Sequence, residues 1–151
     1  MQLIESDIFN GIRKIIPIVC VDLVIPKNGD ILLVKRIEPP AQGQWWTPGG
    51  RIFHGETIED ASVRKANAEV HLDCRFKKIL GVTESIFDNV KIDSKLISIH
   101  TVNVVCLMEL KDATQQIQLD NDHADHLWIN EPFAGLHPGV VQIFDLYSQT
   151  I

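Results

Sequence analysis

The clearest pattern in the chain is a series of apolar runs separated by short polar turns. Residues 15–25 (IIPIVCVDLVI) are rich in β-branched side chains and predict a buried strand. Residues 26–30 (PKNGD) have Asn-Gly at their centre and predict a tight turn, after which residues 31–36 (ILLVKR) return as the second strand of a hairpin. Two further strands are predicted over residues 76–88 and 95–110, the second of them long.

Helical patterns occur between and after these strands. A helix is expected to begin near Thr57, which can serve as its N-cap, with Asp60 three residues on in a capping-box-like arrangement. Residues 123–129 (HADHLWI) predict a loop that ends in a short strand, and residues 140–149 predict an amphipathic helix. The order of strands, helix, strands and helix predicts an α+β fold, a mixed α/β sandwich in a single domain over residues 1–151.

Composition and charge narrow the class of protein. The chain is 45% hydrophobic and 23% charged, with no apolar run of membrane-spanning length, which is typical of a globular protein. The net charge of −6 disfavours general binding to nucleic acid or to a membrane surface. The cysteines, at positions 20, 74 and 106, are odd in number and scattered, which argues against a disulfide framework. The N-terminus lacks the apolar core of a secretory signal, so we expect a cytoplasmic protein.

One acidic residue lies on the apolar face of the helix predicted after Thr57. Placed on a helical wheel, Glu69 falls inside an apolar arc that consists of Ile58, Ala61, Ala66, Ala68, Val70 and Leu72. A carboxylate in such a position is costly unless it is paired or bound to a cation. Two interpretations follow: Glu69 pairs with Lys65 one helical turn earlier, or it is a metal ligand below the preceding loop.

The loop and helix together carry a spaced motif. The stretch resembles the Nudix box, G-x5-E-x7-R-E-U-x-E-E-x-G-U, in which U is a bulky apolar residue. The matching residues are Gly50, Glu56, Arg64, Glu69 and Leu72. Lys65 stands at the first glutamate after the arginine, Ala68 at one of the paired glutamates, and His71 at the closing glycine. These losses depart from ordinary Nudix pyrophosphohydrolases, whose glutamates bind divalent metals.

A narrower branch of that family has a similarly reduced box. Residues 40–51 (PAQGQWWTPGGR) resemble the signature loop of the GDP-mannose mannosyl hydrolases, which cleave at the sugar carbon instead of at phosphorus. The likeness covers nearly the whole chain, including Asp22, the Lys35-Arg36 pair and the Asp122-His123 loop before a tryptophan. It implies a Nudix-like α/β/α sandwich with a mixed sheet between helices, and a hydrolase that releases GDP and mannose. It also implies a homodimer with the N-terminal segment near the partner.

The resemblance implies a metal ion against the substrate diphosphate. Mg²⁺, or Mn²⁺ in its place, would be held by the carbonyl of Gly49, by the carboxylate of Glu69 and by a ligand from the loop before the catalytic histidine. That last position, usually a glutamine in the family, is Asp122 in this chain. Oxygen ligands of this kind suit Mg²⁺, and a glycine carbonyl can approach a metal with no side chain in the way.

The resemblance also implies roles for the residues that contact the substrate. Arg36 and Arg51 would bind the departing diphosphate, for which the planar fork of arginine is suited. Asp22 would contact the sugar and favour positive charge at the anomeric carbon. His123 would be the base that activates water, since histidine titrates near neutral pH. Phe9 would stack on the guanine base.

Each assignment has a structural alternative. His123 lies in a polar loop and could simply be solvated, Arg36 could be an edge-strand charge, and Phe9 could be a core or dimer-interface residue. A tyrosine that the family uses near Thr101 is absent, and Tyr147 is the only tyrosine. Three functions are consistent with the sequence: a GDP-sugar glycosyl hydrolase, a Nudix pyrophosphohydrolase acting on another nucleoside diphosphate compound, and a nucleotide-sugar-binding module without turnover.

Overall fold

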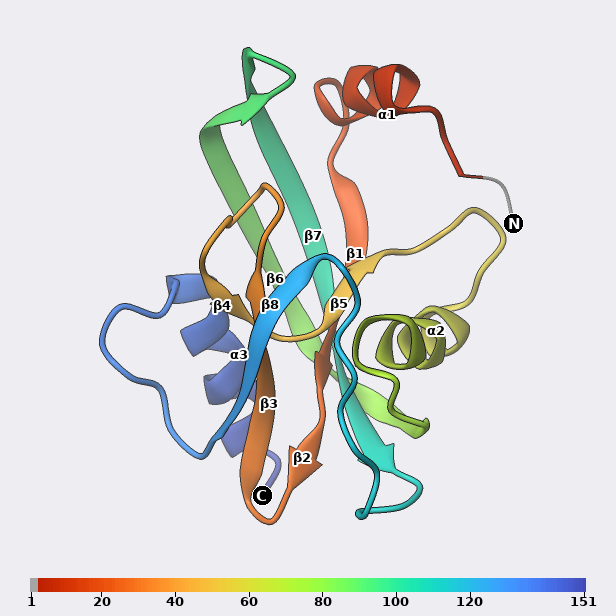
Figure 1. Ribbon diagram of the computed structural model, residues 1–151, viewed down its shortest axis with the longest axis vertical. Coiled ribbons are helices and arrows are strands. Elements are labelled where there is room, and N and C mark those ends of the chain that lie inside the picture. Colours follow the sequence, from red (N-terminus) through yellow and green to blue (C-terminus); the bar gives the residue numbers. More distant parts are fainter. Residues whose placement is uncertain (1–2) are drawn as a thin grey trace.

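Strands make up much of the chain, and they form two sheets that lie between helices (Figure 1). The structure is a computed structural model and describes residues 3–151. The strands are β1 (Ile18–Val24), β2 (Pro26–Lys27), β3 (Asp30–Arg36), β4 (Trp45–Trp46), β5 (Gly49–Arg51), β6 (Cys74–Ile92), β7 (Lys95–Leu110) and β8 (His123–Ile129). The helices are α1 (Ser6–Arg13), α2 (Ile58–Val70) and α3 (Pro138–Ser148). Residue 1, the N-terminal limit of the predicted domain, lies outside the described residues.

The first sheet has the order β5-β1-β7-β6 and is mixed. β1 runs parallel to β7 and antiparallel to β5, while β6 and β7 form a long antiparallel hairpin. In the second sheet β3 pairs with β2, β4 and β8, all antiparallel. This architecture confirms the predicted α+β class with a mixed sheet between helices.

The predicted hairpin forms, but its first strand is β2 and not the predicted strand over residues 15–25. Asn28 and Gly29 have φ angles of 53° and 88°, the left-handed pair that a type I′ turn requires. The strand that pairs with β3 across this turn is the short β2, because both edges of β1 are already occupied by β5 and β7. The prediction that β1 itself forms the hairpin with β3 is therefore wrong, and the chain changes sheet between Val24 and Pro26.

The helix after the signature loop begins as predicted. Thr57 is the N-cap, and its hydroxyl accepts a hydrogen bond of 3.0 Å from the backbone N–H of Asp60. At the other end His71 adopts φ 55°, the left-handed conformation that the glycine of the box would adopt without strain. Ala68, placed on the apolar face by the wheel, is exposed, whereas Glu69 is buried.

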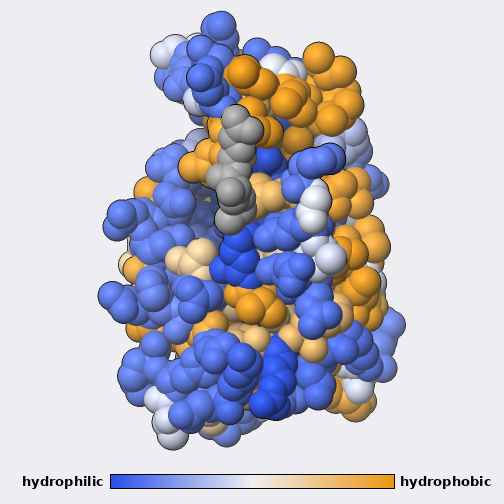
Figure 2. Space-filling model, turned by 90° about the vertical axis from the view of Figure 1, so that its right-hand side faces the viewer, coloured by the Kyte–Doolittle hydropathy of each residue, from blue (hydrophilic) through white to orange (hydrophobic). Residues whose placement is uncertain are grey.

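Two segments differ from the sequence prediction. β8 begins at His123 and pairs with β3 along its whole length, so the expected loop at its start is wrong. α1 was not expected, although Ile4, Ile8 and Ile12 recur at helical spacing; none of its residues is buried. Exposed apolar side chains gather around this helix (Figure 2). They are Leu3, Ile4, Ile8, Ile15 and Ile16.

The core consists of two clusters of buried side chains, one on each side of the sheets. The cluster under α2 includes Val21, Leu23, Leu32, Val70 and Met108. The cluster under α3 includes Val24, Leu33, Val105, Ile143 and Phe144. β1 contributes to both, which explains its nearly continuous apolar sequence. Within residues 3–151, no helix is long and apolar enough to cross a membrane.

Gly49 is the position where the fold has least room for a side chain. A Cβ there would collide with the carbonyl oxygen of Val21 and lie 3.1 Å from the Cα of Asp22. We therefore expect Gly49→Ala to lower the free energy of unfolding by roughly 1–3 kcal/mol, measured by urea denaturation, because β1 and β5 must separate. Gly11→Ala is the control, since a Cβ on this α1 glycine meets nothing within 4 Å. A Gly49→Ala protein as stable as the Gly11→Ala protein would contradict this account of β1 and β5.

Candidate active site

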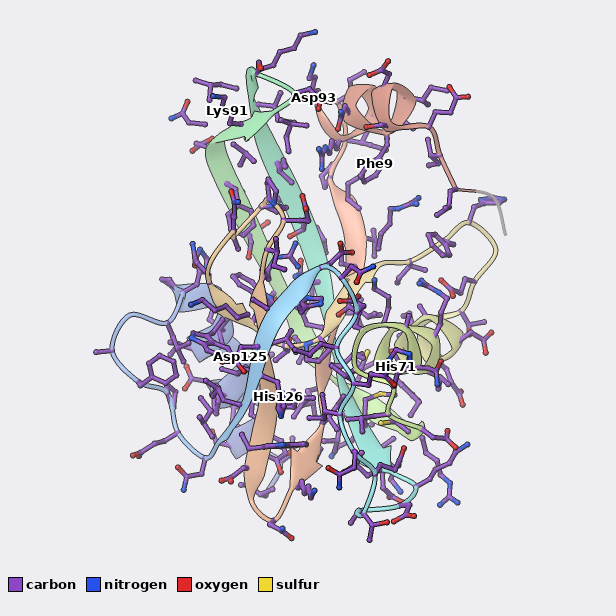
Figure 3. The ribbon with its side chains drawn as sticks, in the orientation of Figure 1. Phe9, His71, Lys91, Asp93, Asp125 and His126 are labelled. Atoms are coloured by element: carbon purple, nitrogen blue, oxygen red, sulfur yellow. The ribbon has the colours of Figure 1, made fainter. Side chains whose placement is uncertain are left out.

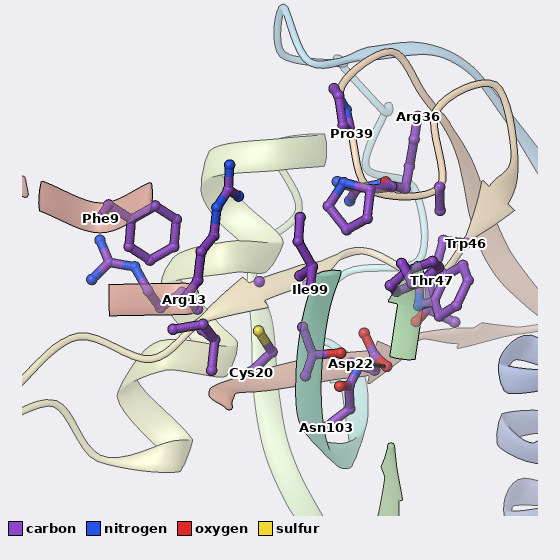
Figure 4. Close-up of a pocket in the computed structure, with 18 residues that line it drawn as sticks. Phe9, Arg13, Cys20, Asp22, Arg36, Pro39, Trp46, Thr47, Ile99 and Asn103 are labelled. Carbon is purple, nitrogen blue, oxygen red and sulfur yellow. Dashed lines mark hydrogen bonds between the residues drawn. The ribbon is translucent and has the colours of Figure 1, made fainter. Parts of the chain in front are cut away.

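A pocket of about 230 Å³ opens where β1, β5 and β7 meet the segment between β3 and β4 (Figure 4). Phe9 and Arg13 of α1 lie on one side of it, and Arg36 lies on the other. Asp22 and Asn103 point toward each other from neighbouring strands. Of the residues proposed for the substrate on sequence grounds, Phe9, Asp22, Arg36 and Arg51 all line this pocket, as does Gly49.

Asp22 is a buried carboxylate in the pocket wall. Its side chain accepts a hydrogen bond of 2.7 Å from Nδ2 of Asn103. Burial raises the pKa of Asp22 to about 6, although the hydrogen bonds from Asn103 and Trp46 and the charge of Arg36 act to lower it. Asp22 can therefore change its charge close to neutral pH, which is common for groups at functional sites.

Two further buried polar atoms line the same pocket. Oδ1 of Asn103 and Oγ1 of Thr47 have no hydrogen-bond partner within the described residues, although both residues are at least 95% buried. A buried polar atom without a partner costs free energy, so such atoms in a pocket wall favour a ligand that supplies the partner.

Three arginines give the pocket a positive rim. The Arg51 guanidinium lies 4.9 Å from the ring centroid of Phe9, and that of Arg13 lies 5.1 Å from the same ring. Nε of Arg36 donates a hydrogen bond of 2.9 Å to the carbonyl of Pro40, which fixes the side chain in the pocket. Burial lowers the pKa of Arg13, and the charge of Asp93 acts in the opposite direction. Groups of this kind suit a diphosphate.

A second group of polar side chains lies behind the glycines of the signature loop. Oε2 of Glu69 accepts a hydrogen bond of 3.0 Å from the backbone N–H of Gly49 and lies 3.9 Å from Nε2 of His123. Nδ1 of His123 lies 2.7 Å from Oδ1 of Asp120. His123 is buried, so it is not the solvated loop histidine that the polar sequence around it allowed. Within the described chain, neither Glu69 nor His123 lines the pocket, and Gly49 connects the two groups.

Glu69 forms the pair with Lys65 that was one of the interpretations of its buried carboxylate. Its Oε1 lies 2.7 Å from Nζ of Lys65, one turn earlier on α2. The other matching glutamate, Glu56, is bound to Arg64 at 2.6 Å. Both carboxylates of the box that this chain retains are thus neutralised by side chains of α2.

The donors around Glu69 do not fit Mg²⁺ in this arrangement. Asp122 has an exposed side chain, and only its backbone contributes to the site loop, through bonds of 3.0 Å with Asp120 and Ile37. Among residues 3–151, no group of three acidic, histidine or cysteine side chains that could hold a metal ion comes together. Glu69 is a single carboxylate that already binds an ammonium group.

Three residues of these two groups had no place in the sequence prediction. Asn103 interrupts an apolar strand as Asp22 does, so the same signal could have revealed it. Asp120 stands three residues before His123. It contacts the His123 ring only because the chain turns between the two residues. Arg13 reaches the pocket from the end of α1, a helix that was not expected.

The fold and site define a Nudix-type hydrolase domain. The profile of the NUDIX domain matches residues 16–140, so the chain belongs to the NUDIX domain family. Low-salt glycan biosynthesis protein Agl8 of Haloferax volcanii is 33% identical over 142 residues, which cover 94% of this chain and 89% of that protein. ADP-ribose pyrophosphatase of Methanocaldococcus jannaschii is 44% identical over 69 residues, 46% of this chain and 41% of that protein.

Solved structures agree on the fold. The dihydroneopterin triphosphate pyrophosphohydrolase of E. coli superimposes with a TM-score of 0.68 at 18% identity, covering 88% of this chain and 96% of that chain. The NUDIX domain of Shewanella oneidensis NrtR, in complex with ADP ribose, has a TM-score of 0.63 at 19% identity, covering 98% of this chain and 99% of that chain.

The raised pKa of Asp22 predicts how stability depends on pH. Below about pH 4 the Asp22 carboxyl is protonated in the folded and unfolded states alike. Between about pH 4 and pH 6 the free energy of unfolding falls, because the unfolded state releases the proton at a lower pH than the folded state. Asp22→Asn should therefore raise the free energy of unfolding near neutral pH by up to about 3 kcal/mol and by little near pH 4. Urea denaturation at both pH values measures this, with exposed Asp88→Asn as the control. An equal gain at both pH values would show that the burial of charge is not the cause.

Proposed function

We propose that the protein hydrolyses nucleoside diphosphate sugars, with GDP-mannose as the first substrate to test and with GDP and mannose as products. The observation that carries this proposal is the grouping of Asp22, Arg36, Arg51 and Phe9 in one pocket. These residues come from four separate segments, and each has a role implied by the likeness to the mannosyl hydrolases. The printed name of the 33% identical relative, a glycan biosynthesis protein, is also consistent with a sugar-linked substrate.

The arginines would bind the diphosphate. Water attacks the anomeric carbon, the bond from that carbon to the diphosphate oxygen breaks, and negative charge grows on the departing nucleoside diphosphate. Arg36 and Arg51 stabilise that charge by charge-assisted hydrogen bonds. Phe9 lines the pocket beside Arg51, and we assign it to the nucleobase by the likeness to the mannosyl hydrolases.

Asp22 would face the sugar. Its carboxylate is ionised above about pH 6, and the negative charge stabilises the oxocarbenium character of the anomeric carbon. Asn103 Oδ1 and Thr47 Oγ1 are the neighbouring atoms that sugar hydroxyls would satisfy. This division places sugar recognition on β1 and β7 and diphosphate binding at the rim.

His123 is the base that the likeness to the mannosyl hydrolases implies, although its buried ring lies behind Gly49 and does not line the pocket. The bond from Nδ1 to Asp120 orients the ring and leaves Nε2, which faces Glu69, as the basic nitrogen. Asp22 is the alternative base, because it lines the pocket and titrates close to neutrality. Attack on one face with departure from the other leads to inversion at the anomeric carbon.

Nudix hydrolases generally use divalent metal ions such as Mg²⁺. The expected ligands Gly49, Glu69 and Asp122 do not form a suitable donor set in this arrangement, so the proposed steps are assigned to the side chains of the chain alone.

A specific relative favours a second candidate function. The ADP-ribose pyrophosphatase that matches 46% of this chain is, by its name, an enzyme that cleaves a pyrophosphate bond. A pyrophosphohydrolase would attack phosphorus and release a nucleoside monophosphate and a sugar phosphate. The two functions differ in the bond that breaks, so the products separate them.

The experiment that tests the proposal is hydrolysis in oxygen-18 water over a panel of nucleoside diphosphate sugars, with mass analysis of both products. Attack at carbon places the label in the free sugar and leaves the nucleoside diphosphate unlabelled. Label in a phosphate would establish the pyrophosphohydrolase function instead. No turnover of any member of the panel would refute both and favour a binding module.

The assembly and location are part of the same proposal. The likeness to the mannosyl hydrolases implies a homodimer, and the exposed apolar side chains around α1 are a surface that a second copy would cover. A cytoplasmic location would fit a nucleotide-sugar substrate.

His123 is the residue whose removal tests the proposed base. We expect His123→Ala to lower the maximal rate by about 10²- to 10⁴-fold, the usual contribution of general-base catalysis, with little change in the Michaelis constant. His126→Ala is the control, since His126 lies on the same strand and is exposed (Figure 3). This variant should change the maximal rate little. A normal rate in the His123 variant would remove this residue from the mechanism and make Asp22 the base to examine.

A further inference from the structure

We infer that the ammonium group of Lys65 takes the place of a divalent cation at Glu69, so that the site carries its positive charge on the chain itself. The sequence places Lys65 where the Nudix box has its first glutamate after the arginine. At this position an acidic side chain adds a ligand for a cation, whereas a lysine brings a cation. The structure shows where that cation goes.

Both carboxylate oxygens of Glu69 have partners in the structure. Oε1 is 2.7 Å from Nζ of Lys65, and Oε2 accepts the N–H of Gly49 at 3.0 Å. The side chains of Lys65 and Glu69 are only 20% and 7% exposed, so the pair is shielded from solvent. A metal ion at Glu69 would therefore have to compete with a cation that is already bound there.

The packing around Gly50 places this ammonium directly behind the pocket wall. Gly50 lines the pocket, and a Cβ there would lie 2.9 Å from Nζ of Lys65 and closer still to Cε. Gly50 has φ 147°, a conformation that side chains rarely adopt. The glycine thus provides both the space and the backbone shape that let the lysine reach this position.

The charge of Lys65 acts on the pocket together with the arginines. Cys20 lines the pocket, and burial and then the charge of Asp22 raise the pKa of its thiol to about 12. Lys65, Arg36 and Arg51 each act in the opposite direction on that thiol. Lys65 is therefore close enough to favour negative charge in the pocket, as a metal ion at Glu69 would.

A divalent ion would meet repulsion at this site. It would have to displace Lys65 from Glu69 or bind beside its ammonium. The carboxylates of Asp120 and Asp22 already have hydrogen-bond partners, His123 and Asn103. Glu56 is held by Arg64, through contacts of 2.6 Å and 2.9 Å. The site therefore combines one carboxylate with one built-in cation.

Metal binding tests this inference without any substrate. The melting temperature of the wild-type protein should be the same in Mn²⁺ as in chelator at matched ionic strength. Lys65→Glu places a second carboxylate beside Glu69, so its melting temperature should rise by roughly 5–10 °C at about a hundredfold excess of Mn²⁺ over its dissociation constant. That rise should disappear in Lys65→Glu combined with Glu69→Gln, which removes one ligand.

Two results would overturn the inference. The first is a rise in the melting temperature of wild type in Mn²⁺ that Glu69→Gln abolishes, which would mean that the metal displaces Lys65. The second is an unchanged melting temperature of Lys65→Glu in Mn²⁺, which would mean that Glu69 does not lie where a metal ion can bind. Circular dichroism establishes that each variant is folded. Lys65→Gln is the second variant if Lys65→Glu folds poorly, and it should then show the rise in weaker form.

A second readout rests on the proposed function. Hydrolysis by wild type should be unchanged in excess chelator. Lys65→Met and Lys65→Glu should both be slow in chelator, and Mg²⁺ should restore Lys65→Glu more than Lys65→Met. Lys78→Met, on β6, is the control and should match wild type. Loss of wild-type activity in chelator would overturn the inference. If no substrate is hydrolysed at all, the proposed function fails, while the melting experiment still decides the role of Lys65.

Discussion

The buried carboxylate of Glu69 is the interaction on which the arrangement of the site depends. One of its oxygens binds the backbone of Gly49 and the other binds Lys65, so it joins α2 to the strand that forms the pocket wall. Its backbone carbonyl also accepts the N–H of Asp120, which positions the carboxylate that orients His123. A carboxylate so deeply buried is tolerated only because each oxygen has a partner. The signature loop can approach it because Gly49 has no side chain, which is also why β5 can lie against β1.

Much of the fold could be predicted because the relevant information is local. The Asn-Gly turn, the Thr57 cap and the long β7 follow from residues close together in the sequence. The errors concern pairing at a distance. β1 could not be excluded as the hairpin partner of β3 until both of its edges were known to be occupied. β8 reads as a loop in its polar first half, and only its pairing with β3 makes it a strand.

The site shows the same division. The signature loop led to Arg51, and the likeness over the rest of the chain led to Asp22, Arg36 and Phe9, which all line the pocket. Neither could reveal Asn103 or Asp120, whose roles arise from a strand pairing and from a turn. Asp122 was expected from its place in the sequence, yet its side chain is exposed while Asp120 turns inward. Lys65, which appeared as a lost ligand, is better described as a gained charge.

The central claim is that the arginine-lined pocket binds a nucleoside diphosphate. Calorimetric titration with GDP in chelator, for wild type and for Arg51→Ala, tests it most directly. A charge-assisted hydrogen bond contributes about 1.5–3 kcal/mol, so the account predicts binding by wild type and an affinity at least about tenfold weaker in the variant. Equal affinity in the two proteins, or no binding by wild type, would contradict it.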